Sequence, residues 1–163
     1  MSKSDSPQLT HLDAEGNPRM VDVGEKPVSS RVAVATGRIV MGAATREAIV
    51  SGQTQKGNAL LVAEIAGIQA TKRTADLIPL CHPIPIERVE VRLEAEGDDA
   101  IRATATVGCR WVTGVEMEAL TAVSIALLTV YDMAKALDRG MQIEGVRLLE
   151  KHGGRSGSWV AEA

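Results

Sequence analysis

The chain has 163 residues and a formal net charge of −3, from 18 Lys and Arg against 21 Asp and Glu. This length fits one domain with a sizeable core, and the lack of a basic excess argues against a nucleic-acid partner. The sequence contains no Phe, one Tyr and two Trp, so Val, Ile, Leu, Ala and Met must fill the core. Its two cysteines, Cys81 and Cys109, provide no disulfide framework. With no signal peptide in view, we expect a cytoplasmic protein.

The first predicted elements are a loose N-terminus, a strand and two helices. Residues 1–8 are polar and expected to be flexible, and turn residues continue to position 27. The segment RVAVATGRIVM, residues 31–41, alternates as a strand does. A short helix fits residues 44–52 and ends at Gly52. A second helix fits residues 59 to about 76, because it must end before Pro79.

Two strands, a long helix and a last strand follow. Residues 87–97 alternate charged and apolar side chains, and residues 101–111 form the partner strand of a hairpin. The long helix spans Val115–Leu137, but its uninterrupted apolar part is shorter than the roughly 20 residues of a membrane span. Residues 141–151 form the last strand, and residues 152–163 are predicted to be a mobile, glycine-rich tail.

This order of elements predicts an α+β fold. Two helices must cover one face of an antiparallel sheet, which gives a ferredoxin-like arrangement in broad terms. No internal repeat or low-complexity tract interrupts it.

The long helix has a narrow polar stripe. At about 100° per residue, its polar side chains fall on one side within about 120°; they are Glu118, Thr121, Thr129, Asp132 and Lys135. The remaining surface is almost entirely apolar, so we expect the helix to be enclosed and the stripe to line a cleft or an interface. Asp132 and Lys135 are spaced to meet. Buried, they would form an acid/base pair; on the surface they would form an ordinary ion pair, and the helix alone leaves both open.

The segment DLIPLCHP, residues 76–83, holds Cys81 and His82 between two prolines that restrict the backbone. Zinc binding is disfavoured, because adjacent residues on an extended chain point apart and no CxxC or HxxxH spacing occurs. The other possible ligands are Cys109, His11 and His152. The same geometry disfavours Cys81 as a nucleophile activated by His82. We expect a packed or contacting thiol and a histidine that is either a core residue, a polar contact or a proton carrier.

Several cations occupy positions that suit an anion. Lys56, in QKGN, precedes the second helix, whose free N–H groups can join it in binding. Lys72 and Arg73 lie near the end of that helix, where the helix dipole alone favours them. Lys151 and Arg155 flank two glycines in the tail. Each of these side chains is also explained as a solvated surface cation.

Taken together, the motifs resemble one family. The pattern of the molybdenum-cofactor biosynthesis protein C (MoaC) family matches, in order, LTHLD, RMVDV, KG, AGIQATKRTADLIPLCHP, VEV, TGVEMEALTAVSIALLTVYDMAKAL and VRLLEKHGGRSG. The resemblance runs from about Leu9 to Trp159. The runs LIPLCHP and TGVEMEALTA are its most specific parts.

The resemblance implies a cyclic pyranopterin monophosphate synthase. Such a lyase converts 3′,8-cyclo-7,8-dihydroguanosine 5′-triphosphate into cyclic pyranopterin monophosphate and releases diphosphate. It further implies one catalytic domain over residues 9–151, a ferredoxin-like fold, and dimers grouped into a hexamer with sites at the dimer interface. The expected partner is a GTP-derived nucleotide, with neither nucleic acid nor membrane. No cofactor is required, although Mg²⁺ can accompany the triphosphate.

The resemblance also implies residue roles. Asp132, in YDM, matches the residue assigned to catalysis, and we expect Lys56, Lys135 and His82 to act with it. The implied substrate-binding residues are Leu80, Cys81, His82, Met117, Glu118, Lys72, Lys151 and Arg31. No metal ligand is among them.

The chain departs from the family pattern in two places. Trp111 and Val112 stand where many relatives carry small or charged residues. In the tail, His152 and Arg155 replace a frequent Ser and Lys, and Ser158 replaces a frequent Asp.

Two rival hypotheses remain open at this point. One is a nucleotide-binding or assembly protein that has lost catalysis, against which the intact site residues argue. The other is a zinc-dependent hydrolase built on Cys81 and His82.

Overall fold

The computed structural model describes residues 15–162, so the predicted flexible segment 1–8 and His11 lie outside the described residues. The strands are β1 (Ser29–Val40), β2 (Arg88–Glu96), β3 (Ala100–Trp111), β4 (Gln142–His152) and β5 (Trp159–Val160). The helices are α1 (Ala43–Val50), α2 (Ala59–Thr71), α3 (Thr74–Leu77) and α4 (Glu116–Ala134). Apart from α3 and β5, each of these elements lies where the sequence predicted one.

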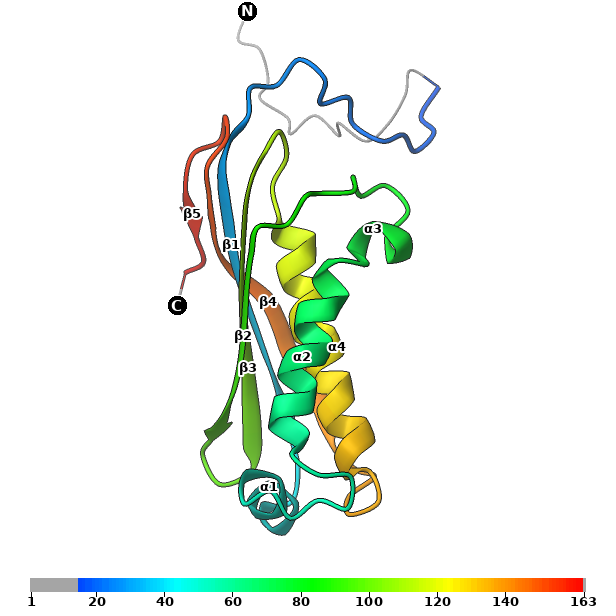
Figure 1. Ribbon diagram of the computed structural model, residues 1–163, viewed down its shortest axis with the longest axis vertical. Coiled ribbons are helices and arrows are strands. Elements are labelled where there is room, and N and C mark those ends of the chain that lie inside the picture. Colours follow the sequence, from blue (N-terminus) through cyan, green and yellow to red (C-terminus); the bar gives the residue numbers. More distant parts are fainter. Residues whose placement is uncertain (1–14, 163) are drawn as a thin grey trace, which may run out of the picture.

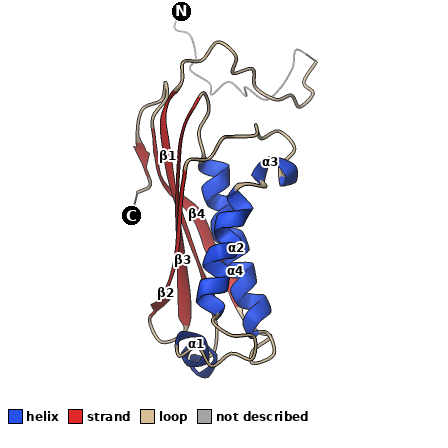
Figure 2. Ribbon diagram, in the orientation of Figure 1, coloured by secondary structure: helices blue, strands red, loops and turns tan. Residues whose placement is uncertain are grey.

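The strands form one antiparallel sheet in the order β2-β3-β1-β4-β5. The long helices α2 and α4 lie side by side on one face of this sheet (Figures 1 and 2). The predicted α+β class and the packing of helices on one face are therefore confirmed. The finer ferredoxin-like class stays a prediction.

Small residues bring the helices close to the sheet and to each other. On β1 the side chains of Ala33, Ala35 and Ile39 are fully buried, as alternation on a strand requires. Between them, Gly37 sits so close to α4 that an added Cβ would lie 3.0 Å from a methyl group of Leu127. Such close approach lets a chain without Phe reach the dense packing of a protein core.

The helix α4 is a core helix of this sheet. Among residues 15–162, it is the one helix that is long and apolar enough to cross a membrane by length and composition. It packs on the sheet and against α2, and residues such as Ala119, Val123 and Leu127 are fully buried there. Its apolar character is thus explained by packing within the chain.

The predicted second helix is shorter than expected. It was predicted to reach about Asp76, but α2 ends at Thr71 and the separate turn α3 follows. The hydroxyl of Thr74 donates to the backbone oxygens of Ala70 and Thr71. Threonine hydroxyls that bond to the preceding turn compete with the helical ladder, so the helix breaks here.

The tail contains a strand that the sequence did not reveal. The strand β5 pairs with β4, with Trp159 opposite Lys151 and Val160 opposite Glu150. Two residues are too few for a pattern of alternation to be visible. The predicted mobility of residues 152–163 stays a prediction.

Candidate active site

The two ends of α4 carry two separate groups of predicted site residues. Glu118 lies in the first turn and Asp132 near the last. They are about four turns apart, which is about 21 Å along the helix axis. Glu118 and Asp132 of one chain are therefore too far apart to act on the same part of a substrate, although both lie on the polar side of α4.

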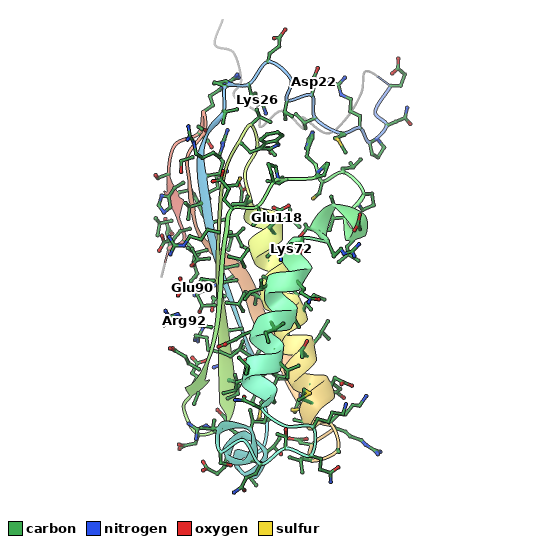
Figure 3. The ribbon with its side chains drawn as sticks, viewed as in Figure 1. Asp22, Lys26, Lys72, Glu90, Arg92 and Glu118 are labelled. Atoms are coloured by element: carbon green, nitrogen blue, oxygen red, sulfur yellow. The ribbon has the colours of Figure 1, made fainter. Side chains whose placement is uncertain are left out.

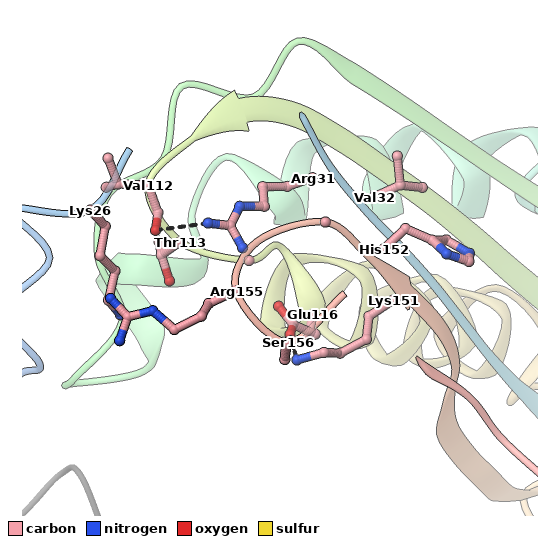
Figure 4. A pocket seen from close by; sticks show the side chains of 12 residues that line it. Lys26, Arg31, Val32, Val112, Thr113, Glu116, Lys151, His152, Arg155 and Ser156 are labelled. Carbon is pink, nitrogen blue, oxygen red and sulfur yellow. Dashed lines mark hydrogen bonds and ion pairs between the residues drawn. The ribbon is translucent and has the colours of Figure 1, made fainter. Parts of the chain in front are cut away.

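A hollow of about 500 Å³ lies near the start of α4, and we call it the cation pocket. Its charged lining residues are Lys26, Arg31, Glu116, Lys151 and Arg155. Figure 4 shows these side chains around the hollow. The lysine at 151 donates to Glu116, with 2.9 Å between Nζ and Oε1. The predicted binding residues Arg31 and Lys151 are thus brought together, and positive charge predominates.

The guanidinium of Arg31 is held in place by the backbone. Its Nε lies 3.3 Å from the oxygen of Trp111, and one terminal nitrogen lies 3.1 Å from the oxygen of Val112. These donors are arranged around a planar group, so two bonds fix its orientation. The remaining N–H groups are available to an anion in the pocket.

A second hollow of about 400 Å³ adjoins the first, and we call it the histidine pocket. It collects the predicted substrate-binding residues Leu80, Cys81, His82, Met117 and Glu118. The residues that line both pockets are Lys26, Thr113, Gly114 and Glu116. The two hollows therefore form one continuous region at this end of the sheet.

Glu118 is the buried carboxyl of this region, with 3% of its surface exposed. The pKa of Glu118 is raised to about 7, chiefly by burial and also by the charge of Glu116, against a lowering by a backbone hydrogen bond. Burial, followed by the charge of Glu118, also raises the pKa of Cys81. A carboxyl poised near neutral pH can give or take a proton, whereas the thiol stays protonated there.

The imidazole of His82 is tied to the N-terminal segment. Its Nε2 lies 2.9 Å from the backbone oxygen of Val21. A carbonyl oxygen only accepts hydrogen bonds, so Nε2 carries the hydrogen and Nδ1 of the neutral ring is an acceptor. The ring therefore has a defined partner, as expected of a histidine that makes a polar contact.

Asp132, Lys56 and Lys135 form an ion-pair cluster at the opposite end of α4. The Oδ2 of Asp132 lies 2.7 Å from Lys56 Nζ, and its Oδ1 lies 2.8 Å from Lys135 Nζ. Hydrogen bonds from Lys135 and then Lys56 lower the pKa of Asp132 to about 2. The meeting of Asp132 and Lys135 that their spacing predicted is therefore present, with Lys56 beside them, although the catalytic role of all three stays a prediction.

The polar stripe does not lie in one environment. Glu118 is buried, whereas the side chains of Asp132 and Lys135 are each 54% exposed. The expectation that the stripe lines a cleft is met at Glu118, which lines the histidine pocket, whereas Asp132 and Lys135 are half exposed in the single chain. The alternative that the stripe lines an interface stays a prediction.

Lys72 stands apart from both pockets. It caps the C-terminus of α2 and is exposed, at the same end of the molecule as Glu118 and Lys26 (Figure 3). It lines neither the cation pocket nor the histidine pocket. Its predicted contact with substrate stays a prediction.

The described part of the chain offers no ligand set for zinc. Among residues 15–162, no three His, Cys, Asp or Glu side chains lie together in a way that could hold a metal ion. Cys81 and Cys109 are both free thiols. The hydrolase hypothesis therefore finds no support in this geometry.

Comparison with known proteins decides the family. A family model described as the MoaC family matches residues 20–154. The chain belongs to the MoaC family. The resemblance predicted from the motifs is thereby confirmed.

Two MoaC relatives are similar along almost their full length. A cyclic pyranopterin monophosphate synthase from Chloroflexus aggregans is 57% identical over 156 residues, which cover 95% of this chain and 94% of the relative. A protein of the same name from Chloroflexus aurantiacus is 56% identical over 153 residues, covering 93% of this chain and 94% of the relative.

Lys26 and Glu116 are two MoaC pocket residues that the sequence did not single out. Lys26 lies in an irregular segment without periodicity, so nothing in its neighbourhood distinguished it from a surface lysine. Glu116 stands inside the specific run TGVEMEALTA, which was the available signal. Its pairing with Lys151 becomes visible only when β4 and α4 are placed together.

Proposed function

We propose that this chain is a cyclic pyranopterin monophosphate synthase, which acts on 3′,8-cyclo-7,8-dihydroguanosine 5′-triphosphate in molybdenum cofactor biosynthesis. The observation that carries this proposal is the junction of the two pockets, which share Lys26 and Glu116. One pocket suits a polyphosphate, and the other offers titratable groups for a ring rearrangement. The relatives named above carry the name of this activity.

The cation pocket suits the triphosphate. Lys26, Arg31, Lys151 and Arg155 line it, and Glu116 is the carboxylate among its described lining residues. Fixed positive groups stabilise the charge that develops on a departing diphosphate. To bind phosphate, Lys151 must give up its ion pair with Glu116. Arg31 is already oriented by two backbone oxygens.

The histidine pocket suits the pterin-forming end of the substrate. Opening and closing rings around a guanine requires protons at several positions, so several acid/base groups must converge. Glu118, with its pKa near 7, is available in either protonation state. His82 presents a defined acceptor nitrogen, provided that its ring is neutral.

The ion-pair cluster of Asp132, Lys56 and Lys135 can join the histidine pocket in one site only if a second copy of the chain takes part. Within one chain, Asp132 lies about 21 Å along α4 from Glu118. A two-fold axis across the middle of α4 would place Asp132, Lys56 and Lys135 of one copy beside the histidine pocket of the other. Such an isologous pairing generates two identical composite sites.

An exposed apolar surface lies between the two ends and suits this pairing. Its residues are Leu61, Val62 and Ile65 on α2 and Leu128 on α4, with exposures between 41% and 53%. Large apolar side chains gathered on one face mark an interaction surface. We propose that the dimer forms here and that dimers group into a hexamer, which light scattering in solution can test.

The proposed reaction makes the enzyme a phosphorus–oxygen lyase. A hydroxyl oxygen of the substrate bonds to the α-phosphorus and gives its proton to a base of the site. The bond between the α-phosphorus and the oxygen that bridges to the β-phosphorus breaks, and diphosphate leaves with that oxygen. Both cysteines are free thiols, in keeping with a proposed cytoplasmic location.

Because Glu116 is already paired with Lys151, we propose that any Mg²⁺ is held by phosphate oxygens and water. Activity that survives chelation would support this, and a requirement for one tightly bound metal would contradict it.

The activity itself is tested with the cyclised nucleotide as substrate. We expect purified protein to release diphosphate and to form a product that becomes a fluorescent pterin after oxidation. A well-folded oligomer that forms neither product would overturn the proposal.

Mixed oligomers test the composite site. Asp132→Asn and His82→Ala chains are each expected to be inactive alone. If the site combines two copies, mixing them yields some sites without either substitution, and about a quarter of the parental activity returns after random pairing. No recovery in verified mixed dimers would contradict the shared site.

A further inference from the structure

The tail forms a closed loop beside the cation pocket. The loop runs from His152, the last residue of β4, to Ser158, which precedes β5. The N–H of Gly157 donates to the oxygen of Gly154 at 3.2 Å, so Arg155 lies at the tip of a turn. Arg155 lines the cation pocket from this tip.

A short chain of hydrogen bonds closes the loop at its base. The Nδ1 of His152 lies 2.9 Å from Ser158 Oγ, and its Nε2 lies 3.0 Å from Glu150 Oε2. Glu150 and His152 are two residues apart on a strand, so their side chains project from the same face. Together these three residues form what we call the tail clamp.

The loop backbone also packs against a substrate-binding residue. Gly153 and Gly154 have φ angles of 98° and 76°, in the left-handed region that favours glycine. A Cβ on Gly153 would collide with the oxygen of Ser30, and one on Gly154 with the guanidinium of Arg31. The loop therefore lies directly on Arg31, and its position and that of the pocket wall are linked.

Arg155 depends on this loop for its position. Among residues 15–162, its side chain makes no hydrogen bond or ion pair, and residue 155 is exposed. It also lines a neighbouring hollow together with Lys26 and Arg31. Without a partner of its own, its guanidinium reaches the cation pocket only while the turn is held in place.

We propose that His152 is a positioning residue, which acts through the tail clamp to hold Arg155 over the diphosphate portion of the substrate. This inference rests on the proposed function. Ionised Glu150 only accepts hydrogen bonds, so Nε2 carries the hydrogen and Nδ1 of the neutral ring accepts from the Ser158 hydroxyl. The clamp therefore joins a β4 side chain to the start of β5 through one imidazole.

The chemistry of the clamp supplies matched variants. In H152N the amide stands near the place of Nδ1 and can keep the Ser158 contact. In H152Q the amide stands near the place of Nε2 and can keep only the Glu150 contact. H152A keeps neither, and S158A removes the hydroxyl while leaving the imidazole in place.

Binding of inorganic diphosphate by calorimetry tests the proposal without requiring turnover. We expect H152A, H152Q and S158A to raise the Kd about fivefold to tenfold, as displacement of one charged contact does. H152N should recover most of this loss. In steady-state assays the same variants should raise KM while kcat changes by less than about twofold, because the lost contact holds the substrate equally well in the ground state and in the transition state.

A double-mutant cycle separates positioning from a general structural role. If the clamp acts through Arg155, H152A adds nothing to the loss caused by R155A. Equal losses in both backgrounds, or an unchanged Kd in both H152A and S158A, would overturn the inference. The control R92A, on the exposed side of β2, should bind diphosphate like the parent. Diphosphate binding that follows this pattern in a protein without synthase activity would keep the clamp and refute the proposed function.

Discussion

The Nζ of Lys56 lies 2.7 Å from Oδ2 of Asp132, although 76 residues separate them in the chain. This ion pair joins the turn before α2 to the last turn of α4. The backbone oxygen of Asp132 accepts from the same ammonium at 3.1 Å. The ammonium group of Lys56 therefore binds both the backbone and the carboxylate of Asp132.

Replacing Asp132 by Asn tests the role of its charge. The change preserves the shape but removes the group that orients two ammonium groups, so we expect kcat to fall at least 100-fold, within the range of lost acid/base catalysis. Because exposed ion pairs contribute little to folding, Tm should change little. An unaltered kcat, measured on a folded variant, would rule out the catalytic role.

The buried carboxyl of Glu118 predicts a pH-dependent stability. Its folded pKa, about 7, lies above the unfolded value of about 4.3. Between these values the folded state holds the additional proton, so the free energy of unfolding falls as pH rises. Above pH 7 the loss is complete, at most about 4 kcal/mol. Glu118→Gln should remove this dependence.

Denaturant titrations at pH 5 and pH 8 measure that effect. The gain in stability of Glu118→Gln over the parent should be larger at pH 8. Glu94→Gln, an exposed position on β2, serves as the matched control and should show no such difference. Equal gains for Glu118→Gln at both pH values would show that its carboxyl titrates normally.

The contact between His82 and Val21 predicts local protection of the N-terminal segment. We expect His82→Ala to increase amide hydrogen exchange in residues 19–26, because the segment loses its bond to the imidazole. His82→Gln can place an N–H near the same carbonyl oxygen and should retain part of the protection. If both variants exchange like the parent, the contact does not hold the segment in solution.

A buried glycine predicts a packing limit between the long helices. A Cβ on Gly67 of α2 would lie 3.0 Å from the backbone oxygen of Ala122 on α4. Gly67→Ala gains about 1 kcal/mol in helix propensity, but overpacking costs about 1–3 kcal/mol, so we expect a net loss of stability. Gly108→Ala, where the nearest atom would lie 3.5 Å away, is the control and should be tolerated.

The sequence predicted most of the fold because its strands alternate clearly. Residues 31–41, 87–97 and 101–111 each show a period of two, and the structure has strands over almost the same ranges. The helix end near Thr71 was missed because threonine side chains, and not the apolar pattern, decide it. A strand of two residues, such as β5, leaves no pattern to detect.

The candidate site was predicted in part, and its geometry could not be. A helical projection gives the direction of each side chain around the axis and ignores its position along the axis. Glu118 and Asp132 therefore fell in the same sector of the projection, although they lie about 21 Å apart. Lys26 was missed because an irregular segment has no period. In the tail, where the chain departs from the family pattern, the contact between His152 and Ser158 could not be predicted, because it depends on the folding back of β5 onto β4.

A substitution at Gly37 would disturb side chains that lie far from it. Any side chain at this position would meet Val146, Leu127 and Val123 at about 3 Å or less, and would push the long helix outward. Since that helix carries Glu118 in its first turn and Asp132 in its last, both groups of candidate site residues would shift at once. A screen for inactive variants would then score Gly37 together with the candidate acid/base groups, although Gly37 lines neither the cation pocket nor the histidine pocket.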